Sequence, residues 1–273
     1  MSKIEVLKHL AEQGSVDAQY QLGYRYYYGK DLKQNKEEAV KWFKLSADQG
    51  YKDAQFMLAG CYDFGNGAKE DTSLAVKYYT LASKQSHPKA QFMLGDYYYT
   101  QGNITEAIKW FKLSADQNDD ESEFMLAECY YSQNKKEEAF TYFKLSAEKG
   151  NPKAQYNLGN CYFNGIGISK NPEEALKWLR SSAKKDNPKA QFMIGMFYYN
   201  GTILEKDLRK AFRCFKLAAD LNDSNSQGML GMLYYKGEGI YKDLTQAKIW
   251  LDKSSLQGNS IAQKMLQEFF YNN

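Results

Sequence analysis

The chain repeats one short motif eight times. Variants of the sequence Ala-Gln-aromatic-Met-Leu-Gly begin at Ala18, Ala54, Ala90, Ser122, Ala154, Ala190, Ser226 and Ala262, so successive copies are 36 or 32 residues apart. A period in this range is typical of stacked supersecondary units, each too small to bury its apolar side chains alone. The repeat therefore predicts one continuous solenoid with a long surface. Such a surface favours binding to another macromolecule over a closed catalytic pocket.

Each repeat predicts two helices. In the first complete repeat, Ala18, Leu22 and Tyr26 are spaced four residues apart and form one stripe of a helix over about residues 17–28. A second helix is expected over about residues 36–49. Small residues recur after the Leu22 position, at Gly23, Ala59, Gly95, Ala127, Gly159, Gly195 and Gly231. Because glycine inside a helix costs ~1 kcal/mol relative to alanine, its recurrence predicts a close contact between the two helices.

Capping residues mark the expected helix boundaries. Candidate N-caps precede the second helix of six repeats, at Asn35, Asp71, Asn103, Asn171, Asp207 and Asp243. Their side chains can accept hydrogen bonds from the first free N–H groups of a helix. The four prolines, Pro88, Pro152, Pro172 and Pro188, fit first-turn positions, where no N–H is needed. The fold class expected is all-α, a right-handed α/α superhelical solenoid of helix-turn-helix repeats.

The repeat boundaries predict a single solenoid domain over residues 1–273. It comprises an N-terminal half repeat (1–17), seven repeats (18–53, 54–89, 90–121, 122–153, 154–189, 190–225 and 226–261) and a C-terminal capping helix (262–273). The third and fourth repeats are the shorter ones, because the connection between their helices lacks four residues.

Charge and hydropathy limit which kinds of partner and which cellular location are expected for the chain. The net charge of +3 implies no strongly electrostatic partner, so neither nucleic acid nor a membrane is expected. No apolar run approaches the ~18 residues that a membrane span needs. The N-terminal segment carries Lys3, Glu5, Lys8 and Glu12, unlike a secretory signal. A cytoplasmic protein is expected, and a translocated effector stays open.

Cysteine and histidine residues do not indicate a catalytic or metal site. Cys61, Cys129 and Cys161 share one position of the repeat, and equivalent positions of neighbouring units lie ~8–10 Å apart. A disulfide needs Cα atoms within ~7 Å, so these three and Cys214 are expected to be free, half-buried thiols. His87 precedes Pro88 and is expected at the surface. No catalytic residue, metal or cofactor is predicted, and the chain is not expected to be an enzyme.

The motifs resemble a known repeat family. The segment AQYNLGNCYFNGIG at 154–167, followed by NPEEALKW at 171–178, resembles the Sel-one-like repeat (SLR), a relative of the tetratricopeptide repeat. The resemblance covers nearly the whole chain, and the third and fourth repeats depart toward the shorter tetratricopeptide layout. It implies a TPR-like alpha solenoid that acts as an adaptor or scaffold for protein–protein interaction. Some family members are linked to weak penicillin-binding or β-lactamase activity, which stays as an alternative.

The resemblance also implies that the first helix of each repeat lines a concave groove. Counted from the leading alanine as zero, positions 2, 6 and 9 share a face away from the core stripe. Position 2 carries Tyr20, Phe56, Phe92, Phe124, Tyr156 and Phe192, which are expected to be partly structural. Position 9 carries Tyr27, Tyr99, Tyr131, Phe163, Tyr199 and Tyr235. Position 6 adds Asp96, Glu128, Asn160, Met196 and Met232.

The aromatic residues at position 9 predict a partner-binding site, because apolar surface patches usually mark interaction sites. The alternative is that these rings stack on one another between repeats. The predicted function is non-enzymatic binding of a peptide or protein segment in this groove. Acidic residues of the second to fourth repeats (Asp63, Asp96, Glu121 and Glu128) favour a segment that is basic toward one end.

Weak homo-oligomer formation through the C-terminal helix, at Phe269, Phe270 and Tyr271, is a further alternative.

Overall fold

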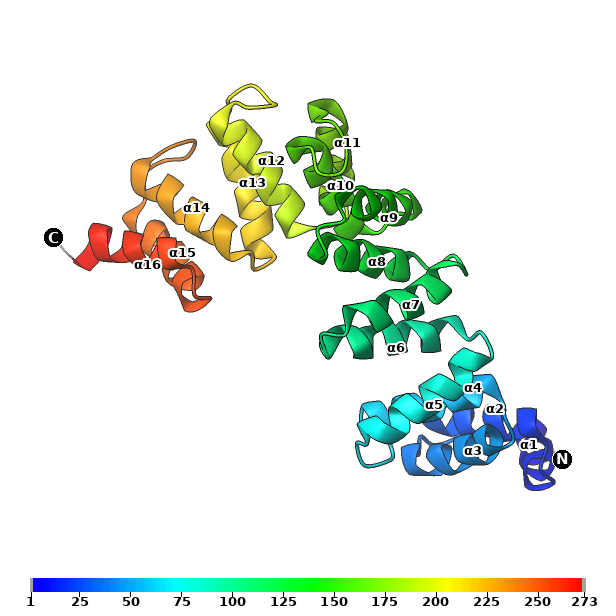
Figure 1. Cartoon of the computed structure of the whole chain (residues 1–273). Coiled ribbons are helices and arrows are strands. Elements are labelled where there is room, and N and C mark those ends of the chain that lie inside the picture. Colours follow the sequence, from blue (N-terminus) through cyan, green and yellow to red (C-terminus); the bar gives the residue numbers. More distant parts are fainter. Residues whose placement is uncertain (1, 272–273) are drawn as a thin grey trace. The chain divides into compact units, whose positions relative to one another are not determined.

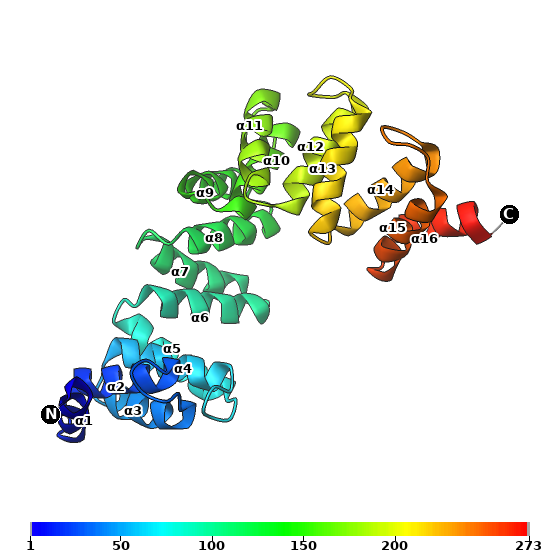
Figure 2. The same ribbon diagram turned by 180° about the vertical axis from the view of Figure 1, so that it is seen from behind.

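The computed structural model describes residues 2–271, so Met1, Asn272 and Asn273 of the expected terminal elements lie outside the described residues. The chain divides into two compact units, Met1–Cys129 (unit 1) and Tyr130–Asn273 (unit 2). Every described element is a helix, and within each unit consecutive helices pack against one another in pairs (Figures 1 and 2). The predicted all-α solenoid of helix-turn-helix repeats is therefore confirmed.

The helices follow the predicted repeat order. Unit 1 holds α1 (Lys3–Glu12), α2 (Val16–Tyr28), α3 (Lys36–Asp48), α4 (Lys52–Asp63), α5 (Thr72–Lys84), α6 (Pro88–Thr100) and α7 (Ile104–Ala115), and the unit boundary falls within α8 (Asp120–Ser132). Unit 2 holds α9 (Lys136–Lys149), α10 (Pro152–Asn164), α11 (Pro172–Ala183), α12 (Pro188–Asn200), α13 (Leu208–Asp220), α14 (Ser224–Lys236), α15 (Leu244–Leu256), α16 (Ser260–Leu266) and the π-helix η1 (Gln267–Tyr271). The even-numbered helices are helix A of each repeat, and the odd-numbered helices from α3 are helix B.

The predicted capping residues are confirmed. Asn35 Oδ1 accepts a hydrogen bond from the backbone N–H of Glu38 at 3.0 Å, which closes the first turn of α3. The side chains of the other five predicted N-caps accept equivalent bonds, at Asp71, Asn103, Asn171, Asp207 and Asp243. All four prolines lie in the first turn of a helix. Local sequence therefore sets where these helices begin.

Helices A and B of a repeat touch where the small residues recur. A Cβ atom placed on Gly95 of α6 would lie 2.5 Å from Cδ1 of Phe111 in α7, and one on Gly23 of α2 would lie 2.7 Å from Cδ1 of Phe43 in α3. Both phenylalanine side chains are fully buried. The aromatic ring thus occupies the space that a side chain at the glycine position would need. This confirms the predicted close contact between the two helices.

In six of the seven repeats, a buried glutamine joins the repeat to the preceding helix. In α4, Gln55 donates through Nε2 to the carbonyl oxygen of Ala47 in the preceding repeat at 3.2 Å. Its Oε1 accepts from Nε2 of Gln85, which follows helix B of the same repeat, at 2.9 Å. The Gln55 side chain is 4% exposed. Because a buried amide without partners would cost stability, the two bonds offset the cost of placing Gln55 in the interior.

The same bridge recurs along the chain, and it is incomplete in two repeats. Gln227 of α14 accepts from Gln257 at 2.7 Å, as Gln55 does from Gln85. In the repeat of α12, Leu221 occupies the position of Gln85, and the buried Oε1 of Gln191 has no hydrogen-bond partner. In the repeat of α10, Lys185 occupies the position of Gln85 and donates to the Gly150 carbonyl. The Oε1 of Gln155 is likewise unpartnered there.

Two expectations about single residues were wrong. Cys61, Cys129 and Cys161 are fully buried rather than half-buried, and burial raises the pKa of Cys61 and of Cys129 to about 12. His87 is buried rather than exposed. Its Nδ1 accepts from the backbone N–H of Ala90 at 3.2 Å, so it caps α6. Its ring stacks on Phe56 with the centroids 4.6 Å apart, and burial lowers its pKa.

The helix A–helix B contact predicts opposite effects for two glycine substitutions. Gly95→Ala is expected to reduce the free energy of unfolding by about 1–3 kcal/mol, because the new methyl group overlaps the Phe111 ring. The matched control is Gly60→Ala in α4, where the added Cβ lies 3.8 Å from the Tyr79 hydroxyl. This control is expected to be neutral or stabilising by up to ~1 kcal/mol. Denaturant unfolding of both variants tests the contact, and equal effects would contradict it.

The incomplete glutamine bridge predicts a stabilising substitution. Leu221→Gln supplies the donor that Gln191 Oε1 lacks, and Leu221 is 44% exposed, so little apolar burial is lost. The expected gain is about 1 kcal/mol in the free energy of unfolding. The reverse change, Gln85→Leu, should destabilise the chain. A Leu221→Gln variant that unfolds at the same or lower denaturant concentration than the wild type would argue against the bridge.

Candidate functional site

The predicted groove residues lie on the A helices. We call the residues at positions 2, 6, 9 and 10 of these helices the A-helix face, and we describe it separately in unit 1 (α2, α4, α6) and in unit 2 (α10, α12, α14). Most of the predicted site residues are half-buried, and Tyr131 is 47% exposed. Phe124 and Met232 are each 9% exposed and count as core residues. Contrary to expectation, these two side chains are not available to a partner.

The position 2 aromatics pack inside their own repeat. In unit 1, the ring centroids of Phe92 and Phe111 are 5.6 Å apart. Tyr20 contacts Phe43 in the same way at 6.0 Å, and Phe56 contacts Tyr79 at 5.9 Å. In unit 2, Phe192 lies 5.7 Å from Phe215. These rings join helix A to helix B, so the expectation of a partly structural role agrees with their contacts.

In unit 2, position 9 aromatics pack against the following repeat. The Phe163 ring lies 5.0 Å from Phe197 of α12. The Tyr199 hydroxyl donates to Oε2 of Glu238, in the loop after α14, at 3.2 Å. Phe163 therefore packs against a ring of the next repeat, and Tyr199 is held to the next repeat by a hydrogen bond, so both residues join neighbouring repeats in addition to any binding role.

The C-terminal aromatic residues cover the last position 9 ring. Phe269 stacks on Tyr235 with the centroids 3.9 Å apart and the planes at 8°, and Phe270 lies 6.0 Å away. Lys248 Nζ lies 5.3 Å from the centre of the Tyr271 ring, so all three aromatics that were considered for self-association contact their own chain. Tyr271 is 60% exposed.

Unit 1 keeps accessible aromatic rings on the same face. Tyr20, Tyr24 and Tyr28 form a column along α2, with centroids 6.2 Å and 4.5 Å apart. Tyr24 is 39% exposed, Tyr28 is 55% exposed and Phe64, at the end of α4, is 62% exposed. A shallow pocket of about 250 Å³ lies along this column, lined by Tyr20, Gln21, Tyr24, Arg25 and Lys30.

Sequence reasoning missed three of these rings, Tyr24, Tyr28 and Phe64. The signal was present, because Tyr20, Tyr24 and Tyr28 recur every four residues, as side chains on one face of a helix do. Tyr24 lies at position 6 but was not among the residues predicted there, and Tyr28 and Phe64 lie at position 10, for which no prediction was made.

The A-helix face of unit 1 also carries carboxylates. Asp63 takes position 9 in α4 and accepts a hydrogen bond from the Tyr79 hydroxyl at 3.2 Å. Asp96 takes position 6 in α6, and partial burial together with the nearby Asp63 charge raises its pKa. In unit 2, position 6 carries the uncharged residues Asn160, Met196 and Met232. The acidic character predicted for the earlier repeats therefore belongs to the A-helix face of unit 1.

Residues 2–271 show neither a metal site nor a membrane-spanning helix. This range contains no group of three His, Cys, Asp or Glu side chains placed to hold a metal ion. None of its helices combines the length and apolar character needed to cross a bilayer.

Comparison with known families and structures agrees with the repeat architecture. The Sel1 repeat matches residues 16–51, 52–87, 88–119, 152–187, 188–223 and 224–259, and a tetratricopeptide repeat matches residues 121–149. The tetratricopeptide match falls on the fourth repeat, one of the two that were expected to depart toward that layout. No match was found among curated proteins.

Two solved structures are similar over almost the whole chain. One is a protective antigen of uropathogenic Escherichia coli with an SLR fold, at 30% identity and a TM-score of 0.84, covering 98% of this chain and 60% of that one. The other is a Sel1 repeat protein from Oxalobacter formigenes, at 29% identity and a TM-score of 0.82, covering 97% of this chain and 79% of that one. This chain thus spans less than two thirds of the length of the Escherichia coli protein.

Proteins built from Sel1 repeats are generally scaffolds for protein–protein interaction. The matched repeats extend over more than half of the sequence, and the helix pairs described above follow their boundaries. The chain therefore belongs to the Sel1 repeat family.

Proposed function

We propose that the chain is a non-enzymatic scaffold that binds a peptide or protein segment along the A-helix face, chiefly in unit 1. The observation that carries this proposal is the column of accessible tyrosines on α2, which shares the A-helix face of unit 1 with the carboxylates of α4 and α6. Accessible aromatic rings gathered on one surface usually mark an interaction site. Tyrosine is also enriched among the residues that dominate binding energy in interfaces.

The chemistry of this face favours a basic segment with apolar or aromatic side chains. Asp63 and Asp96 offer acceptors for lysine or arginine side chains, and the tyrosine faces of α2 attract cations as well. A segment laid across α2, α4 and α6 would meet aromatic rings and carboxylates in turn. The partner in this proposal is therefore a basic segment with aromatic or aliphatic anchors.

The cost of burying Asp96 supports a binding role. Its raised pKa means that the folded chain disfavours the charged carboxylate, so an ionised Asp96 reduces stability at neutral pH. Binding sites often retain residues that are unfavourable for stability alone. A cationic partner would relieve this cost by pairing with the carboxylate.

Unit 2 has a smaller part in the proposal. Its position 9 rings at Phe163, Tyr199 and Tyr235 already contact the following repeat or the C-terminal helix. Tyr131, Tyr156, Asn160 and Met196 remain candidate contacts for a long partner.

Selection of peptides tests the proposed specificity. Short random peptides panned against the full chain should enrich sequences that combine Lys or Arg with aromatic residues. The double variant Asp63→Asn/Asp96→Asn should bind a selected peptide about tenfold more weakly, because each substitution removes a charged acceptor without changing side-chain volume. The matched control, Glu12→Gln/Glu37→Gln, removes two exposed carboxylates from α1 and α3 and should bind normally.

Tyr24→Ala/Tyr28→Ala should also weaken binding, with circular dichroism unchanged. Selected peptides without basic residues, or equal loss in the control variant, would refute the proposed specificity.

The raised pKa of Asp96 predicts a pH-dependent effect on stability. The pKa of Asp96 in the folded chain lies above the ordinary value of 3.8. The stability associated with protonated Asp96 is therefore fully present below pH 3.8, and it is lost as the pH rises through the folded-state pKa. Asp96→Asn cannot ionise. It should therefore be more stable than the wild type at pH 7, and this advantage should disappear below the ordinary pKa. Thermal unfolding across this pH range measures the difference, and a destabilised variant at pH 7 would contradict the assignment.

A further inference from the structure

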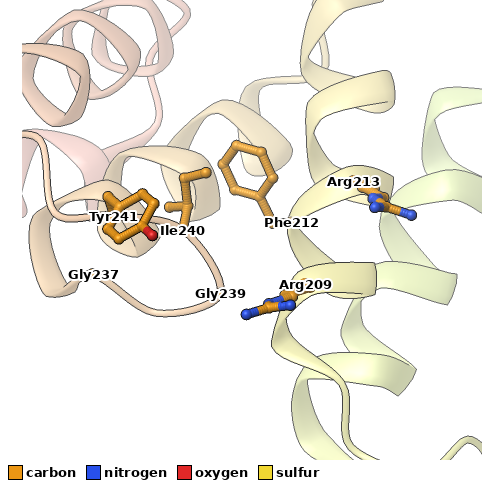
Figure 3. Close-up of a pocket in the computed structure, with 7 residues that line it drawn as sticks. All are labelled: Arg209, Phe212, Arg213, Gly237, Gly239, Ile240 and Tyr241. Carbon is orange, nitrogen blue, oxygen red and sulfur yellow. The ribbon is translucent and has the colours of Figure 1, made fainter.

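A second cavity lies away from the A-helix face, in unit 2. It has a volume of about 550 Å³ and is lined by Arg209, Phe212, Arg213, Gly237, Gly239, Ile240 and Tyr241. The first three residues belong to α13, and the other four belong to the loop that joins α14 to α15 (Figure 3). Figure 3 shows the loop facing the helix, with Phe212 and Ile240 directed toward one another between them.

The loop wall of this cavity is held by a contact that the fold repeats. Gly239 has a φ of +74°, and a Cβ atom on it would overlap the carbonyl oxygen of Leu208, the first residue of α13. Gly67 rests in the same way on Lys36 of α3, and Gly167 rests on Lys136 of α9. Three loops therefore lie on the first turn of the preceding helix B. The cavity wall is therefore built in the same way as two other loops of the chain.

The charge at this cavity differs from the charge at the two equivalent loop contacts, where Gly67 rests on α3 and Gly167 rests on α9. The second residue of helix B is Glu37 in α3 and Glu137 in α9, but it is Arg209 in α13. A carboxylate in the first helical turn is favoured by the helix dipole, whereas a cation there is disfavoured. Arg209 therefore departs from the local preference for a negative charge. Such departures are expected where a residue serves a ligand.

The two arginines are available to a ligand. Arg209 and Arg213 lie one turn apart on α13, both are exposed, and neither forms an ion pair with a carboxylate among residues 2–271. By contrast, Arg25 pairs with Asp31 and Lys210 pairs with Asp207. The chain has 36 lysines and arginines, of which only four are arginines, so two of the four line this cavity. A guanidinium group binds a carboxylate through two parallel hydrogen bonds, which lysine cannot do.

Apolar surface lies beside these cations. Phe212 is half-buried and its ring contacts Tyr234 edge-on at 5.4 Å, so it forms a fixed part of the wall. Tyr241 is 93% exposed at the other side of the cavity. Such an exposed ring next to an open cavity is suited to hold a flat or apolar side chain of a partner.

Acidic residues around the cavity limit how much negative charge a ligand can carry. Asp207 caps α13, Asp243 caps α15, and Glu238 lies in the loop itself. A nucleic acid or an anionic membrane presents a continuous row of charges and would meet these carboxylates. A peptide with one or two carboxylates next to an apolar residue would not.

We infer that this cavity binds an acidic peptide segment of a partner protein. Its carboxylates pair with Arg209 and Arg213, and its neighbouring aromatic or aliphatic side chain enters the space between Phe212 and Tyr241. This site is independent of the proposed A-helix face and has the opposite charge preference. The scaffold would thus hold a basic segment on unit 1 and an acidic segment on unit 2.

The test uses the full chain and a labelled peptide of sequence Gly-Glu-Trp-Glu-Gly, with the Gln-for-Glu peptide as the ligand control. Fluorescence anisotropy should show binding of the acidic peptide that weakens with added salt. The variant Arg209→Gln/Arg213→Gln should lose about tenfold or more in affinity. Arg180→Gln, at an exposed arginine of α11, is the matched control and should bind as the wild type does.

A further variant separates specific pairing from general charge. Arg209→Lys/Arg213→Lys keeps both charges and should still lose several-fold in affinity, because lysine cannot form the paired hydrogen bonds. Equal binding by the Arg209→Gln/Arg213→Gln variant, or equal binding of the Gln peptide, would overturn the inference. Tighter binding of heparin or of phosphatidylserine vesicles than of the acidic peptide, through the same two arginines, would also overturn it. The failure of this test would leave the proposed unit 1 site unaffected.

Discussion

The contact between the two helices of each repeat is the constraint on which the other features depend. Gly23, Gly95 and Gly195 leave a space on helix A, and Phe43, Phe111 and Phe215 of helix B fill it. Protein interiors are packed too densely to allow another arrangement at such a contact. The contact therefore fixes the rotation of helix A about its own axis. This rotation in turn determines which side chains of helix A face the next repeat and which side chains form the A-helix face.

Repeats are joined by polar as well as apolar contacts. The second residue of the motif is glutamine in six repeats, and its buried side chain bonds to the end of the preceding helix B. An amide can serve this role because it donates and accepts at once, which alanine or leucine cannot do. Where the partner glutamine is replaced, at Lys185 and Leu221, the buried oxygen loses its donor. The bridge thus specifies register between repeats, and its loss is tolerated in single repeats.

The sequence predicted the local elements of the fold well, because their causes are local. Asn35 caps α3, Pro188 begins α12 and Gly95 meets Phe111, as expected from short-range chemistry. The candidate site was predicted less completely. The spacing of residues along a helix predicts which side chains lie on the same face of that helix. It does not predict which of these side chains the neighbouring repeat buries. Met232 is therefore core, Tyr235 lies under Phe269, and His87 is buried against Phe56, none of which periodicity could show.

The proposed scaffold has two surfaces of different charge, and a basic segment lies across the A helices of unit 1. Photo-cross-linking tests this claim most directly. A basic, aromatic peptide that binds the full chain would carry a photoreactive phenylalanine analogue, and mass spectrometry would locate the linked residues. Cross-links are expected in α2, α4 and α6, at or next to Tyr24, Phe64 and Asp96. Cross-links confined to α3, α5 and α7 would contradict it.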